Sequence, residues 1–108
     1  MDSIKEIKKF AAIDIGSNAI RLLISNIIIT NKSETISTKN ALVRVPVRLG
    51  QDAFTIGRVS NENIKRLIDA MISFKLLMNV HKVEKYLAYG TSALRCSSNR
   101  DSVIDLIL

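Results

Sequence analysis

Two apolar runs separated by only three residues constrain the fold of this chain more than any other feature. Residues 10–15 are apolar except for Asp14, and residues 19–29 are rich in Ile and Leu. The tripeptide Gly16-Ser17-Asn18 lies between them, which predicts strands over residues 10–16 and 19–29 joined by a tight turn. We expect the glycine to supply a positive φ in that turn, because it adopts this conformation without strain.

A third strand is predicted over residues 35–49, after a polar turn at residues 30–34. Near its end, apolar residues alternate with Arg44, Pro46 and Arg48, a pattern typical of a half-buried strand. Because proline cannot donate a backbone hydrogen bond, Pro46 favours an edge position. The first three strands are therefore expected to form a meander, preceded by a frayed lead-in at residues 1–9.

The remaining chain predicts a connector, two helices and one further strand. The connector is residues 50–59, the long helix runs from the N-cap Ser60 to about Asn79, and its apolar stripe is expected to face the core. A strand follows at residues 83–90, and a second helix begins near Asn99 or Arg100. The stripe comprises Ile64, Leu67, Ile68, Met71, Phe74 and Met78.

The resulting order, β-β-β-α-β-α, predicts an α/β protein with a mixed sheet. In such sheets ligands gather at the carboxyl ends of strands. Residues 14–18 end the first strand and residues 91–95 end the fourth, so both polar loops are expected at the same end of the sheet. The element order alone thus predicts a composite site.

Residues 14–18 carry side chains suited to a phosphate accompanied by a divalent metal. A carboxylate in an apolar strand is costly unless it is paired, solvated or near a cation, so Asp14 is the metal candidate, through a coordinated water. Gly16, Ser17 and Asn18 would cradle phosphate with backbone and side-chain donors. The competing interpretation is a solvated aspartate beside an ordinary hairpin.

Two arginines and two hydroxyl residues complete the candidate set. Arg21 and Arg95 are predicted to clamp phosphate, since a guanidinium contacts two oxygens at once; either could instead be a surface residue paired with a carboxylate. Thr91 and Ser92 would donate hydroxyl hydrogen bonds to substrate or simply cap the next turn. Arg48 is a weaker candidate, because strand alternation also explains it.

These motifs resemble those of the exopolyphosphatase/guanosine pentaphosphate phosphohydrolase family. The resemblance rests on Asp14-Ile15-Gly16-Ser17-Asn18 with Arg21-Leu22-Leu23, on Arg48-Leu49-Gly50-Gln51, on Val59-Ser60-Asn61-Glu62, and on Tyr89-Gly90-Thr91-Ser92-Ala93-Leu94-Arg95. Tyr-Gly stands where the family usually has a pair such as Val-Ala. The resemblance covers most of residues 10–107.

The resemblance implies a ribonuclease H-like fold of the actin–hexokinase–Hsp70 ATPase superfamily and hydrolysis of terminal phosphoanhydrides. The substrate would be polyphosphate or guanosine pentaphosphate, with Mg²⁺ as cofactor. The family's general-base glutamate and second phosphate loop match nothing here and are expected beyond residue 108. Residues 1–108 therefore look like a partial N-terminal actin-like domain, cut before a fifth strand and inactive alone.

Two other functions remain open from the sequence. One is a lobe of a sugar or acetate kinase of the same superfamily, against which residues 91–95 argue. The other is an anion-binding module without catalysis. Loss of a fifth strand would also leave an unpaired edge on the fourth, which invites self-association, so a homodimer is among the expected states.

The composition limits the kinds of partner that this chain is expected to bind. The net charge of +6 favours polyanions, but the lysines are scattered and no aromatic–basic interleaving is present, which argues against specific nucleic-acid binding.

No apolar run approaches the roughly 20 residues of a membrane helix. Cys96 is the one cysteine, so an internal disulfide is excluded, and with the lone His81 it makes no zinc site. We expect a cytoplasmic protein without membrane contact.

Overall fold

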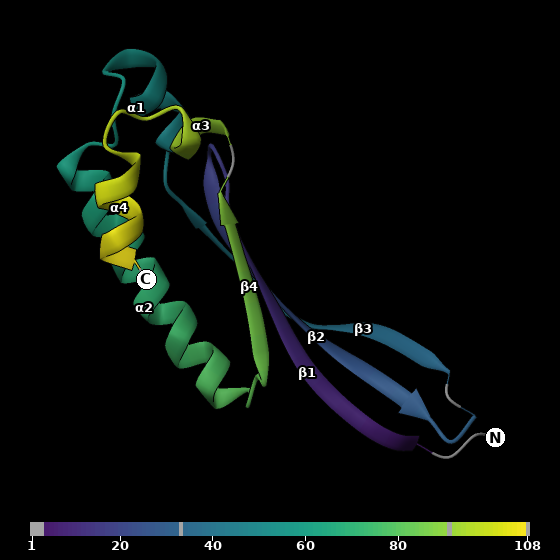
Figure 1. Cartoon of the computed structure of the whole chain (residues 1–108). Helices are drawn as coiled ribbons and strands as arrows, with labels where there is room; N and C mark the ends of the chain where they lie inside the picture. Colours follow the sequence, from purple (N-terminus) through teal and green to yellow (C-terminus); the bar gives the residue numbers. More distant parts are fainter. Residues whose placement is uncertain (1–3, 33, 91, 108) are drawn as a thin grey trace.

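The computed structural model describes residues 4–32, 34–90 and 92–107 and forms a mixed four-stranded sheet covered on one face by helices (Figure 1). The sheet order is β3-β2-β1-β4; β1 pairs antiparallel with β2, and β2 with β3, whereas β4 runs parallel to β1. The elements are β1 (Ile4–Ile15), β2 (Ala19–Thr30), β3 (Thr35–Pro46), α1 (Leu49–Thr55), α2 (Asn61–Val80), β4 (Lys85–Gly90), α3 (Ser92–Arg95) and α4 (Arg100–Ile107).

The predicted element order is confirmed, with two short helices that the sequence analysis missed. α1 occupies most of the predicted connector, and α3 is a single turn. Neither is long enough to show an apolar repeat of helical period, so the pattern could not reveal them. β3 also ends three residues earlier than predicted, at Pro46, on the edge of the sheet as expected.

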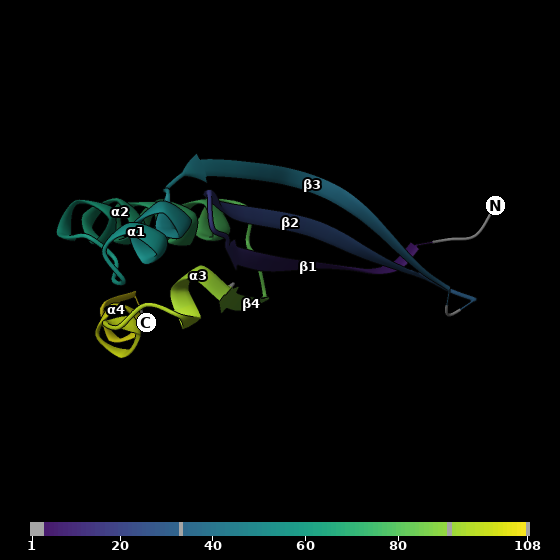
Figure 2. The same ribbon diagram turned by 90° about the horizontal axis from the view of Figure 1, so that it is seen from above.

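The lead-in at residues 1–9 was wrongly expected to fray from residue 4 onward. β1 begins at Ile4, which pairs with Thr30, and β1 continues alongside the isoleucine run of β2. The long hairpin extends the sheet well beyond the helices, and the molecule measures 57 × 23 × 20 Å (Figures 1 and 2). Pairing with an apolar partner strand therefore orders a segment whose own sequence is mostly polar.

The core lies between the sheet and α2. Leu67, Phe74 and Met78 of α2 are buried, as the predicted stripe requires, while Ile64, Ile68 and Met71 are half-buried at its margins. Alternate residues of the central strands face this helix. The fully buried strand side chains are Ile13, Ile20, Leu22 and Ile24.

A side-chain cap defines the start of α2. Ser60 has extended φ and ψ angles, and its hydroxyl accepts a hydrogen bond of 3.2 Å from the backbone N–H of Asn63. This satisfies one of the unpaired donors at the helix N-terminus, and Glu62 places negative charge in the first turn, where the helix dipole favours it. The predicted N-cap is confirmed.

Removing this cap should destabilise the chain measurably. We expect Ser60→Ala to lower the free energy of unfolding by about 1 kcal/mol, because alanine offers no acceptor to Asn63. Urea unfolding followed by circular dichroism measures the change. Ser73→Ala is the matched control, since the Ser73 hydroxyl only donates to the Asp69 carbonyl within the exposed helix face, and we expect it to be neutral or slightly stabilising. Equal losses in both variants would contradict the capping role.

Candidate functional site

The carboxyl ends of β1 and β4 lie side by side. Ile15 pairs with Gly90 and Asp14 with Tyr89, so the loop at residues 16–18 and α3 lie at the same edge of the sheet. This is the arrangement that the element order predicted. It is a consequence of the parallel β1–β4 pair, which directs both chains toward the same end.

The loop at residues 16–18 is fixed by the segment that follows β3. Val47 donates its backbone N–H to the Asn18 carbonyl at 3.2 Å, and Gly50 donates to the Ser17 carbonyl at 2.8 Å. A Cβ on Gly50 would lie 3.1 Å from the Ser17 Cβ, so the first turn of α1 packs directly on the loop. Gly50 is thus a positioning residue of the site that the sequence analysis did not single out as functional.

The conformational reason given for Gly16 was wrong. A positive φ among the described glycines occurs at Gly57, after α1, and not at Gly16. Gly16 is required for space instead: it donates its N–H to the Ala19 carbonyl at 2.9 Å, and a Cβ there would lie 2.7 Å from that same oxygen. The turn closes so tightly that no side chain fits.

Substitution of Gly16 should therefore disturb the loop. We expect Gly16→Ala to lower the free energy of unfolding by about 1–3 kcal/mol, the usual cost of overpacking against a backbone atom. Gly50→Ala should cost less, because its nearest neighbour is a side-chain carbon at 3.1 Å. Urea denaturation of both variants checks the order; a larger loss in Gly50→Ala would contradict it.

Asp14 has an unsatisfied oxygen. The residue is half-buried, and its Oδ1 atom is buried without a hydrogen-bond partner. A buried polar atom normally has a partner, and an unsatisfied one is costly. The orphaned oxygen fits a single contact with a Mg²⁺ ion or its coordinated water, whereas no group of three or more acidic, His or Cys side chains gathers within the part of the chain described.

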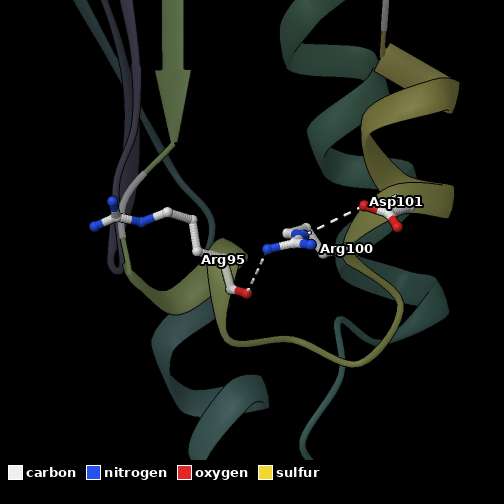
Figure 3. A network of polar contacts seen from close by, with 3 residues as sticks. All are labelled: Arg95, Arg100 and Asp101. Carbon is white, nitrogen blue, oxygen red and sulfur yellow. Dashed lines mark hydrogen bonds and ion pairs between the residues drawn. The ribbon is translucent and has the colours of Figure 1, made fainter.

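Arg21 and Arg95 come from different elements, β2 and α3. Arg21 is exposed on β2 and is the cross-strand neighbour of Asp14. Arg95 is exposed at the end of α3; its side chain points away from Arg100 and Asp101, and only its carbonyl contacts Arg100, at 3.4 Å (Figure 3). Its guanidinium is thus not held by the exposed Arg100–Asp101 ion pair.

Most of the other predicted residues lie at or near the loop, and one lies outside the described residues. Asn18 is exposed at the loop tip, whereas Gly16 and Ser17 are half-buried. Thr91 lies outside the described residues, and Ser92 is the first residue of α3. Arg48 is exposed and precedes α1 without a side-chain capping bond.

A side-chain clamp anchors α3 and α4 to the loop between α1 and α2. The Asn99 amide oxygen accepts from the Val59 N–H at 2.9 Å, and its amide nitrogen donates to the Val59 carbonyl at 3.0 Å. Ser98 donates its backbone N–H to the Gly57 carbonyl at 2.8 Å. These contacts hold α3, and with it Arg95, close to α1, whose first turn packs on the loop at residues 16–18.

Asp52 joins α1 to the start of α2. Its Oδ2 accepts hydrogen bonds of 2.8 Å from the Ser60 N–H and from the Asn63 side chain. Burial alone would raise the pKa of this carboxyl, but the hydrogen bonds from Ser60 and Asn63 and the charge of Arg58 outweigh it, so the pKa lies below its ordinary value of 3.8. The ionised carboxylate is therefore the form that holds α1 in place.

This pKa shift predicts a pH-dependent contribution to stability. Because the folded-state pKa is depressed, the contribution is fully present above the unfolded value and is lost as the pH falls through the folded one. We expect Asp52→Asn to cost about 1 kcal/mol at neutral pH and progressively less below pH 4. Urea unfolding of both proteins between pH 7 and pH 2 measures this; a difference independent of pH would contradict it.

Two cavities lined by described residues lie away from the loop tip. One of about 500 Å³ is mainly apolar and lies between α2, β4 and α4, on the helix side of the sheet. Another of about 360 Å³ lies beside α1 and the start of α2, between Arg48, Asp52, Glu62 and Arg66. Neither cavity is lined by Asp14, Arg21 or Arg95.

Solved structures define the class of this fold. An exopolyphosphatase from Cytophaga hutchinsonii superposes with a TM-score of 0.81 at 31% identity, over 93% of this chain and 30% of that one. The Aquifex aeolicus member of the Ppx/GppA family gives 0.81 at 27% identity, over 93% and 31%. The fold is the mixed α/β sheet of the actin-like ATPase superfamily, as predicted.

Sequence comparison defines the family. Residues 28–107 match the profile of the Ppx/GppA phosphatase family, and the chain therefore belongs to that family. Exopolyphosphatase 2 of Mycobacterium tuberculosis is 36% identical over 93 residues, which is 86% of this chain. A bifunctional 3-dehydroquinate synthase/phosphatase of Fusobacterium nucleatum is 29% identical over 96 residues.

The chain is much shorter than its relatives. It spans 29% of the length of the M. tuberculosis protein and 14% of that of the F. nucleatum protein. Within the described residues, none of the helices combines the length and apolar character needed to cross a membrane.

Proposed function

We propose that this chain is the N-terminal phosphate-binding lobe of an enzyme that hydrolyses terminal phosphoanhydrides of polyphosphate or guanosine pentaphosphate. The observation that carries the proposal is the parallel β1–β4 pair, which brings the loop at residues 16–18 and α3 to one edge of the sheet. Membership of the Ppx/GppA phosphatase family supports the reaction class, and the relatives named as exopolyphosphatases support the substrate.

In this proposal the chain binds and orients the phosphoryl groups. Hydrolysis of a phosphoanhydride spreads negative charge over phosphoryl oxygens, so donors placed in advance stabilise the transition state. Gly16, Ser17 and Asn18 would supply backbone and side-chain donors, with Thr91 and Ser92 adding hydroxyls. Arg21 and Arg95 would grip the oxygens from opposite sides of Asp14.

Asp14 is the proposed contact for Mg²⁺. Its orphaned Oδ1 atom lies at the end of β1, next to the loop, where a metal-bound water or the ion itself would satisfy it. Bound Mg²⁺ would neutralise charge on the phosphoryl oxygens. The remaining ligands and the general-base glutamate would come from protein outside residues 1–108, so the chain alone is proposed to be inactive.

Location and assembly are also proposals. A single exposed cysteine fits a reducing cytoplasm. β4 is an edge strand of the described sheet, and its side chains Tyr86, Leu87 and Tyr89 are exposed. This supports self-association through the β4 edge.

Phosphate release tests the proposed function. The purified chain should release negligible phosphate from polyphosphate, guanosine pentaphosphate or ATP. In a longer protein that contains this chain, release from one of the first two should fall by about 10²-fold or more in Asp14→Ala and in Arg95→Ala, because each removes a group that stabilises developing charge. Arg100→Ala is the control, since its side chain only pairs with Asp101 and the Arg95 carbonyl.

Three results would contradict the proposal: rapid turnover by the 108-residue chain, near-unchanged rates in both site variants, or a preference for ATP as phosphoryl donor. The last of these would favour a kinase lobe instead.

A further inference from the structure

A row of four polar side chains crosses the sheet next to the phosphate loop. By register, Arg44 of β3 lies opposite Arg21 of β2, Arg21 lies opposite Asp14 of β1, and Asp14 lies beside Tyr89 of β4. Their strand neighbours Ile13 and Leu22 are buried under α2. Because successive residues of a strand point to opposite faces, the row lies on the face turned away from the helices.

Two members of this row form a like-charge pair. Arg21 and Arg44 are directly opposite each other on adjacent antiparallel strands, and both are exposed. Like charges in that position destabilise a sheet. Within the described part of the chain neither arginine makes an ion pair or a side-chain hydrogen bond. An anion bound between the two guanidinium groups would relieve this repulsion.

The row is long enough for several linked anions. Adjacent strands lie about 4.8 Å apart, so the Cα atoms of Asp14 and Arg44, two strands apart, are separated by about 10 Å. Paired side chains on adjacent strands have Cβ atoms about 5 Å apart, which lets the two guanidinium groups contact neighbouring oxygens of one ligand. Arg44 lies one strand farther from β1 than Arg21 does.

We propose that Arg44 adds a second anion subsite beside Arg21, which binds the phosphoryl groups of a linear oligophosphate behind the terminal one held by residues 16–18, Arg21 and Arg95. The ligand class rests on the proposed function, but the subsite itself rests on the strand register and the unpaired arginines. It makes Arg44 a determinant of substrate length: a chain of three or more phosphoryl groups uses it, whereas orthophosphate does not.

Binding to the purified 108-residue chain tests this subsite. Isothermal titration with orthophosphate and with tripolyphosphate, at about 0.15 M ionic strength, compares the unmodified chain with Arg44→Gln, Arg95→Gln and Lys39→Gln. Lys39 is exposed on the same strand, so its variant removes the same charge away from the row. Thermal unfolding by circular dichroism checks that each variant is folded.

We expect Arg44→Gln to weaken tripolyphosphate binding about tenfold or more and to leave orthophosphate binding unchanged, because a hydrogen bond between charged groups is worth at least a factor of ten. Lys39→Gln should change neither affinity by more than about twofold, the small effect of a screened, remote charge. Arg95→Gln should weaken both anions. GTP, whose tail is also a triphosphate, should depend on Arg44 as tripolyphosphate does.

The outcomes separate the two proposals. If Arg95→Gln weakens both anions while Arg44→Gln behaves like Lys39→Gln, the subsite is wrong and the phosphate site stands. If Arg44→Gln weakens orthophosphate equally, or affects GTP alone, the subsite is also wrong. If Arg95→Gln changes neither affinity, or if the unmodified chain binds no tripolyphosphate, the proposed function is contradicted. The proposed subsite would then have no ligand to bind.

Discussion

The candidate site depends on the parallel pairing of β4 with β1. β1 is one of the two inner strands of the sheet. On one side it is hydrogen-bonded to β2, so the three antiparallel strands alone would place only the loop at residues 16–18 at this end of the sheet. Pairing β4 along residues 10–15 places Gly90 next to Ile15 and starts α3 beside that loop. A parallel partner must be reached by a crossover, which α2 supplies by packing across the buried face of the sheet. The stripe of α2 and the position of Arg95 are therefore parts of the same constraint.

A second constraint keeps the loop rigid. Its carbonyl groups at Ser17 and Asn18 accept hydrogen bonds from Gly50 and Val47, so the exit of β3 and the first turn of α1 fix the loop from outside the hairpin. α1 is in turn tied to α2 through Asp52. A loop held in this way is preorganised, and preorganisation would lower the entropic cost of binding the proposed anion.

The segments with a clear apolar periodicity are the ones whose structure could be predicted from the sequence. The isoleucine-rich strands and the stripe of α2 have clear periods, so β1 to β4 and α2 were predicted with their order. α1 and α3 have seven and four residues and no repeat, and they form because Leu49, Ala93 and Leu94 are buried against the sheet and its ends. The role of Gly16 was misjudged because a tight approach to the Ala19 carbonyl, unlike a turn type, has no signature in the sequence. Arg44 was read as an exposed strand residue, and only the register with Arg21 gives it a further meaning.

Several local conflicts of this sheet lie in one row. Elsewhere the long helix is capped and the buried Thr30 and Ser97 have hydrogen-bond partners, although the buried Oδ1 atom of Asn26 in β2 has none. Across β1, β2 and β3, by contrast, an acid with an orphaned oxygen lies beside two arginines that face each other. Natural sequences are locally consistent except where function requires otherwise. A stabilising substitution is available at each of these positions, because a neutral β-former would relieve both the desolvation and the repulsion. Their presence together, next to the loop at residues 16–18, is what the proposed anion-binding edge of the sheet would require.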